Sequence, residues 1–137
     1  MKYLFIFLCF LSSSLYAQRI SVYLGSALPL RRTFIGAEVG KRIENISIGL
    51  SGEISPTESN VSPKIYLHLK KISLEGGMGW GHRFGENNDH NYHTYTLGVF
   101  YERKRLFFGS SMLWRSYQAH IGLHRGSLRA IVGYRFE

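Results

Sequence analysis

Residues 128–136 read Leu-Arg-Ala-Ile-Val-Gly-Tyr-Arg-Phe, and the character of the side chain changes at every position. One set of alternate positions is apolar: Leu128, Ala130, Val132, Tyr134 and Phe136. The other set, which includes Arg129 and Arg135, is small or polar except for Ile131. Because successive side chains of a β-strand point to opposite faces, this period of two predicts a strand with one apolar face. A helix would bring the arginines into the apolar stripe.

The same alternation recurs along the chain. Further segments begin near Ile20, Ile35, Ile46, Ile65, Ile72, Thr94, Leu106 and Ala119. With residues 128–136 they make nine segments, whereas a closed antiparallel bacterial barrel normally has an even number of strands. We therefore predict eight strands and place the ambiguity between Leu106 and His124. There, residues 115–118 are either a loop between two strands or a bulge within one.

The connections between these segments also alternate. Residues 28–32, 55–63 and 84–91 are long and polar, whereas residues 42–45, 70–71 and 103–105 are short and basic. Long loops at one end and tight turns at the other are typical of an up-and-down meander. The predicted fold is therefore all-β, a closed antiparallel up-and-down transmembrane β-barrel of about eight strands.

The first 17 residues, MKYLFIFLCFLSSSLYA, have the layout of a secretory signal peptide. Lys2 precedes an apolar run, and three serines lead to Ala17. The alternative is an uncleaved anchor, but the run falls short of the ~20 residues that a spanning helix needs. We expect a signal peptide at residues 1–17 and a single β-barrel domain at residues 18–137. The only cysteine, Cys9, would leave with the signal.

The apolar faces of such strands either form the core of a soluble protein or face outward and contact membrane lipid. The polar face is rich in Gly, Ser and Thr, which suits the narrow interior of an eight-stranded barrel. Aromatic residues stand toward the ends of the apolar segments, as in the girdles at membrane interfaces. The predicted interface aromatic residues are Trp80, Tyr95, Tyr101, Trp114, Tyr134 and Phe136. Both features favour the membrane.

With this pattern over residues 20–136, the chain resembles the small outer-membrane β-barrels, the eight-stranded class that includes the OmpX-like and OmpA-like proteins. The most specific part is the ending at residues 130–136, because such barrels typically close on alternating apolar residues and a terminal aromatic residue. Here Phe136 is penultimate and Glu137 is last. The resemblance implies a place in the bacterial outer membrane, with outer-membrane lipid and the barrel-insertion machinery as partners.

Charged residues share the inward phase of the predicted strands. The predicted lumen network consists of Glu38, Glu53, Glu75, His68, Arg129 and Arg135, with Glu102 and Lys70 in the same phase. Because buried charges must be paired, we expect these residues to pair with one another and to fill the bore. The alternative is a narrow path for ions.

Several chemical sites were weighed. Residues 86–93 carry Glu86, Asp89, His90 and His93, which could hold a metal, but no second histidine pair follows, so we expect neither metal nor cofactor. His120, His124 and Ser127 suggest a hydrolase, because some barrels of this class deacylate lipid A with a His-x-Ser element. Here Gly122 stands where that serine would, and we assign no catalytic residue.

The net charge of +8 raises the question of nucleic acid. The chain shows neither a helix for the major groove nor a base-stacking motif, so we expect no nucleic-acid partner. Seven basic residues lie in the short turns, where they suit anionic head groups. The expected function is a small outer-membrane barrel with a side-chain-filled lumen and a structural or surface-interaction role. The alternatives are a soluble periplasmic β-barrel that binds an apolar ligand and an outer-membrane lipid-modifying enzyme.

Overall fold

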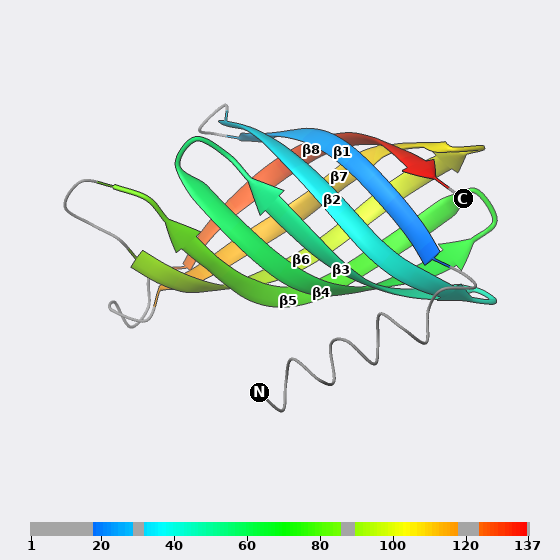
Figure 1. The fold of residues 1–137 in the computed structure, drawn as a ribbon, viewed down its shortest axis with the longest axis horizontal. Coiled ribbons are helices and arrows are strands. Elements are labelled where there is room, and N and C mark those ends of the chain that lie inside the picture. Colours follow the sequence, from blue (N-terminus) through cyan, green and yellow to red (C-terminus); the bar gives the residue numbers. More distant parts are fainter. Residues whose placement is uncertain (1–17, 29–31, 86–89, 118–123, 137) are drawn as a thin grey trace.

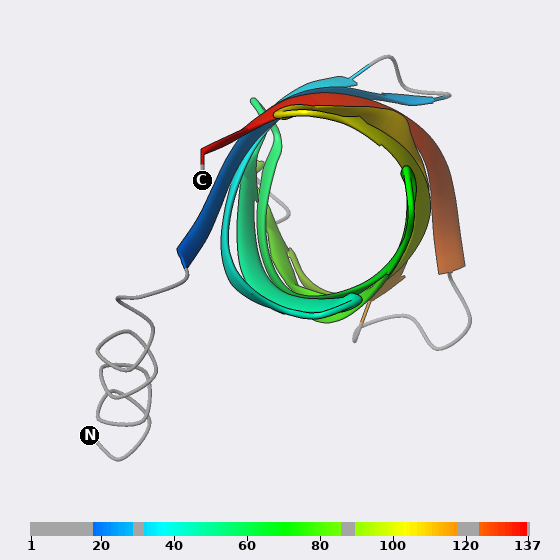
Figure 2. The same cartoon turned by 90° about the vertical axis from the view of Figure 1, so that its right-hand side faces the viewer.

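Eight antiparallel strands close into one barrel in the computed structural model, which describes residues 18–28, 32–85, 90–117 and 124–136 (Figure 1). The strands are β1 (Gln18–Leu28), β2 (Arg32–Ile43), β3 (Ile46–Ile54), β4 (Glu58–Leu69), β5 (Ile72–Arg83), β6 (His90–Arg103), β7 (Leu106–Tyr117) and β8 (His124–Phe136). Each strand pairs with the next, and β8 pairs with β1, so that Leu24 lies opposite Val132. Figure 2 looks nearly along the axis of this closed ring.

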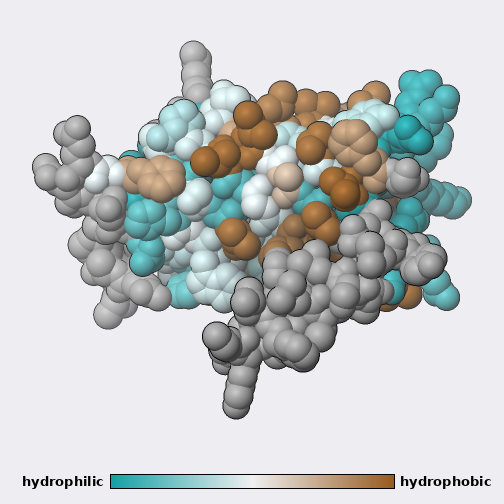
Figure 3. Space-filling model, viewed as in Figure 1, coloured by the Kyte–Doolittle hydropathy of each residue, from teal (hydrophilic) through white to brown (hydrophobic). Residues whose placement is uncertain are grey.

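The apolar faces point outward. The exposed fraction is 36% for Leu50, 61% for Leu97 and 53% for Val132, whereas it is 8% for Glu53 and 1% for Arg129. Aliphatic side chains of all eight strands share this exposed face. Figure 3 shows hydrophobic groups on the one side of the barrel that faces the viewer. This arrangement is the reverse of a soluble β-barrel, in which the apolar face forms the core. Among the described residues, no helix has the length and apolar character to cross a membrane.

The prediction of eight strands is confirmed, and the structure resolves the region that made the count ambiguous. β7 continues to Tyr117, so residues 115–117 belong to a strand and not to a loop. Residues 119–123, which we counted as part of a separate segment, lie outside the described residues, and β8 begins at His124.

One predicted loop was wrong. Only residues 55–57 separate β3 from β4, and Pro63 lies within β4, on its outward face. We predicted a loop over residues 55–63 because this stretch is polar, and its proline cannot donate to a strand ladder. The β4–β5 ladder accommodates it by omitting two rungs, between the pairs Val61–Trp80 and Lys64–Gly77. The middles of the other two long connections, residues 29–31 and 86–89, lie outside the described residues.

The short turns are as tight as predicted, but the inward placement of Lys70 was wrong. Two residues connect β2 to β3, β4 to β5 and β6 to β7. Lys70 is the first residue of its turn, with an exposed side chain and a φ of 58°. The strand period does not apply to a residue whose backbone has left the extended region.

The interior also contains a cluster of rings that the sequence pattern did not predict. Tyr23, Phe34, Phe100, Phe107 and Ile131 are buried together. Several rings lie over a glycine of a neighbouring strand, as Tyr23 does over Gly36 and Phe107 over Gly133. A Cβ at either glycine would stand 2.2 Å from a ring carbon, so these glycines make the room that the rings occupy.

We expect Gly133→Ala to destabilise the barrel by about 1–3 kcal/mol, because the ring of Phe107 would have to move. That ring is held by Tyr23, Phe100 and the guanidinium of Arg135. Urea unfolding in lipid vesicles measures the change. Gly52→Ala is the matched control, since a Cβ at this outward-facing position meets nothing within 4 Å. Equal stability of the two variants would contradict the packing described here.

Candidate functional site: the charged interior

Ten charged side chains lie inside the described part of the barrel, five of each sign. The cations are Arg19, Lys64, Arg115, Arg129 and Arg135, and the carboxylates are Glu38, Glu53, Glu58, Glu75 and Glu102. We call this set the charged interior. Isolated buried charges are strongly unfavourable, so the equal numbers indicate that the groups neutralise one another.

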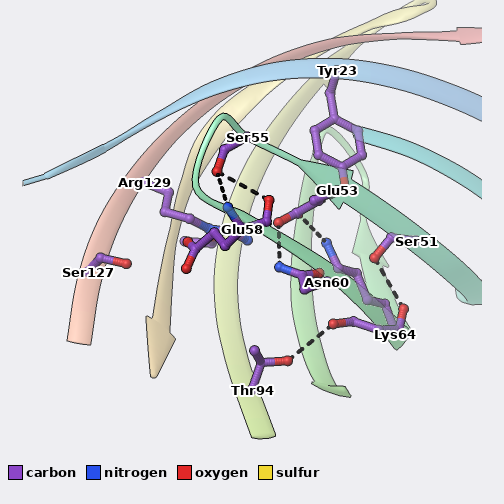
Figure 4. A network of polar contacts seen from close by, with 12 residues as sticks. Tyr23, Ser51, Glu53, Ser55, Glu58, Asn60, Lys64, Thr94, Ser127 and Arg129 are labelled. Atoms are coloured by element: carbon purple, nitrogen blue, oxygen red, sulfur yellow. Dashed lines mark hydrogen bonds and ion pairs between the residues drawn. The ribbon is translucent and has the colours of Figure 1, made fainter. Parts of the chain in front are cut away.

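Glu53 is at the centre of the network (Figure 4). Arg129 Nη1 donates to Glu53 Oε2 at 2.6 Å, and Lys64 Nζ lies 3.7 Å from Glu53 Oε1. The Tyr23 hydroxyl and the Asn60 amide donate to the same carboxylate at 2.9 and 3.0 Å. The Glu53 carboxylate therefore has four donors, contributed by β1, β4 and β8.

Lys64 and Tyr66 extend the network around the barrel through two more carboxylates. Lys64 Nζ donates to Glu75 Oε2 at 3.3 Å. The Tyr66 hydroxyl lies between Glu75 and Glu38, with Glu75 Oε2 at 3.1 Å and a short hydrogen bond to Glu38. These contacts connect β2, β4 and β5 in the middle of the barrel.

A second cluster forms around Glu102, near the end of the barrel that carries the short turns. Arg19 Nη2 lies 3.1 Å from Glu102 Oε1, and Arg135 Nη1 lies 3.2 Å from Glu102 Oε2. Ser73 Oγ donates to Glu102 at 2.6 Å and contacts His68 Nδ1 at 2.7 Å. Glu102 therefore joins β1, β5 and β8 through its own position on β6.

His68 contacts a second serine through its other ring nitrogen. Ser47 Oγ is 2.6 Å from His68 Nε2, which is the spacing of a nucleophile and its base. However, Ser47 is only 3% exposed. Arg19 Nη1 lies 2.9 Å from Ser47 Oγ and 3.0 Å from His68 Nε2. A substrate would have to displace this guanidinium, so the geometry supports a structural role for the pair.

A third group lies at the long-loop end. Arg115 forms a short ion pair with Glu58, and Tyr92 Oη donates to Glu58 Oε2 at 3.1 Å. Arg115 Nη1 also donates to Ser127 Oγ at 3.1 Å. Ser127, which we considered as a hydrolase nucleophile, is thus buried against an arginine. His120 and the side chain of His124 lie outside the described residues, as does most of the possible metal cluster at residues 86–93.

These side chains leave little space. Two interior cavities of about 20 Å³ each remain. Tyr23 and Lys64 line the first, and Phe34, Arg129 and Arg115 line the second. A water molecule needs roughly 10–15 Å³ on this measure, so each cavity has room for about one. At these two places, the side chains of the charged interior and the ring cluster nearly fill the space inside the barrel.

The structure brings the six predicted lumen residues into the interior. Their side chains are buried: Glu38, Glu53, Glu75, His68, Arg129 and Arg135. The sequence pattern did not predict four members of the charged interior: Arg19, Lys64, Glu58 and Arg115. Arg19 was in phase with Ser21 and could have been found from that alternation. Glu58 fell in residues 55–63, which we predicted as a loop, and Arg115 in residues 115–118, for which a loop and a bulge were both possible.

The six predicted aromatic residues lie on the outward face in two groups. Trp80, Tyr95 and Trp114 lie toward the long-loop end, with Tyr95 opposite Trp114 in the β6–β7 ladder. Toward the short turns, the ring of Tyr101 lies 5.3 Å from that of Phe108, and the ring of Tyr134 lies 5.0 Å from that of Phe136. Aliphatic residues such as Leu97 lie between the two groups.

Two solved structures of known proteins are similar to this barrel. No protein-family model and no curated protein matches the sequence. Among solved structures, the N-terminal β-barrel domain of Pseudomonas aeruginosa OprF is similar with a TM-score of 0.58 and 12% identity, covering 88% of this chain and 97% of that one. The fold is that of a small outer-membrane β-barrel. Neisserial surface protein A is also similar, with a TM-score of 0.50 and 12% identity over 87% of this chain and 96% of that one.

Proposed function

We propose that this chain is a small bacterial outer-membrane β-barrel with a structural or surface-interaction role, exported by a signal peptide at residues 1–17. The observation that carries the proposal is the reversed polarity of the barrel. Exposed aliphatic residues surround it, while the charged interior occupies its centre. Exposed aliphatic side chains on every strand are unfavourable in water and favourable against hydrocarbon. The barrel-insertion machinery and outer-membrane lipid are the partners that follow.

The soluble alternative requires an apolar interior that could hold a ligand. The described interior instead carries ten charged side chains, and its two cavities hold about 20 Å³ each. The enzyme alternative requires an accessible nucleophile, but Ser127 and Ser47 are both buried against arginines. These features favour the structural role.

Differential extraction tests the membrane location. We expect the protein to stay with the membrane fraction after washing with high salt and alkali and to require detergent for release. Its gel mobility should change on heating, since folded and unfolded barrels migrate differently. Recovery in buffer without detergent would overturn the proposal.

The filled interior predicts that the barrel does not conduct ions. After reconstitution into planar lipid bilayers, we expect no stepwise conductance in 1 M salt, because the paired side chains leave space for single waters only. A porin in the same bilayers is the positive control for insertion and detection. Stable conductance steps from the folded protein would contradict a structural role and favour the ion path.

A further inference from the structure

The short turns gather positive charge at one end of the barrel. Seven cations lie in or beside the three turns: Lys41, Arg42, Lys70, Lys71, Arg103, Lys104 and Arg105. We call this set the basic collar. All seven side chains are exposed, and Figure 3 shows the hydrophilic surface at this end, on the right. The carboxylate beside them among the described residues is Glu44.

Apart from Arg105, the cations of the basic collar form no ion pair with a carboxylate of the described residues. The charged interior has five groups of each sign, and Glu102, which lies nearest this end, binds Arg19 and Arg135. Because the interior has no surplus carboxylate to offer, the excess charge of the basic collar faces outward. For the six cations other than Arg105, an anionic partner has to come from outside the described residues.

Two of the lysines occupy positions that the backbone makes unfavourable. Lys70 has a φ of 58° and Lys104 a φ of 56°. Glycine and asparagine adopt this left-handed region more easily than lysine does. Glu44, the first residue of the third turn, has a φ of 54°, so this conformation belongs to the two-residue turn, and two of the three turns place a lysine at it.

The side chains beside the turns indicate which kind of partner would bind the basic collar. Each turn is flanked by outward-facing aliphatic residues: Ile43 and Ile46, Leu69 and Ile72, and Leu106. The apolar band therefore ends at the residues where the basic collar begins. If the band lies in hydrocarbon, as the proposed function requires, the ammonium and guanidinium groups lie at the depth of lipid head groups.

We propose that the basic collar binds the head groups of anionic phospholipids in the leaflet that faces the short turns. This rests on the proposed membrane function and goes beyond it, because a barrel can span a membrane without preferring anionic lipid. An acidic protein would also be attracted by the charge, but it would not need aliphatic residues directly beside each turn. Free inorganic phosphate carries the same anionic group as a lipid head group, so the test compares the two as ligands.

The test is a titration of the folded chain in zwitterionic micelles, followed by the NMR shifts of the turn amides. The probes are short-chain phosphatidylglycerol, short-chain phosphatidylcholine and inorganic phosphate. We expect saturable binding of phosphatidylglycerol only, weakened by added salt. Each cation near an anionic surface contributes about fivefold in affinity, so Lys70→Asn with Lys104→Asn should weaken binding about 25-fold.

The two asparagines also keep the test independent of folding. Asparagine tolerates the positive φ, so the double variant should be at least as stable as the parent. Arg32→Gln with Arg83→Gln removes the same charge at the opposite end and should leave the affinity unchanged. Equal binding of the two phospholipids, equal binding of inorganic phosphate, or equal losses in the two double variants would overturn the proposal. If the protein is membrane-embedded and any of these occurs, only the collar proposal fails.

Discussion

Glu53→Ala is expected to destabilise the folded barrel by about 3–5 kcal/mol, which is the typical effect of removing one partner from a buried ion pair. Arg129 would lose its partner at 2.6 Å, and the Tyr23 hydroxyl and the Asn60 amide would lose their acceptor. Lys64 would retain Glu75 at 3.3 Å, which limits the damage on that side. Urea unfolding in lipid vesicles, followed by tryptophan fluorescence or gel mobility, gives the free energy of unfolding.

Two controls separate charge from packing in this experiment. Glu44→Ala removes an exposed turn carboxylate and should change the stability by no more than about 0.5 kcal/mol. Glu53→Met combined with Arg129→Met should be more stable than Glu53→Ala, because no arginine is then left without a partner. If Glu53→Ala behaves like Glu44→Ala, the charged interior does not stabilise the barrel.

Val132→Arg is expected to destabilise the barrel by about 2–4 kcal/mol in lipid, because a charge near the midplane of the bilayer is poorly solvated. Val132 lies opposite Leu24, near the middle of β1, and is 53% exposed on the outward face. The measurement is again unfolding in vesicles of a single lipid. The effect should shrink in detergent micelles, where water reaches the side chain more easily.

Leu69→Arg is the matched control for depth. Leu69 is equally exposed but is the last residue of β4, beside Lys70, and there an arginine should destabilise by only about 0–1 kcal/mol. An equal loss at both sites would mean that the outward face does not cross a membrane with its turns at the surface. A soluble barrel predicts no such dependence on position along the strand.

The strands themselves were largely predictable because their information is local. Apolar side chains occupy every second position of residues 128–136, and β8 spans them as expected. The mistakes arose where local signals compete. The polar residues 55–63 suggested a loop, yet Pro63 lies within β4, where its outward position and two missing rungs accommodate it. For residues 115–118 a loop and a bulge were both possible, and Arg115 lies in β7, where it is buried against Glu58.

The sequence predicted which side chains point into the barrel, but it did not predict which of them contact one another. Alternation places Glu53 and Arg129 inside, yet nothing in the sequence indicates that these two residues, 76 positions apart, share a hydrogen bond. The ring cluster was missed for a similar reason. Phe107 interrupts its own apolar segment, and its packing over Gly133 becomes visible only when β7 lies beside β8.

The amino-acid sequence by itself determined a chain of two-faced strands, because a period of two depends only on neighbouring residues along one strand. Only the tertiary structure decided which carboxylate meets which cation and how little space remains between them. Those contacts depend on the closure of β1 onto β8 and on the register of every pair of strands around the ring. Register is a property of the whole barrel, since a slip of one residue in any pair would turn an inward side chain toward the outside.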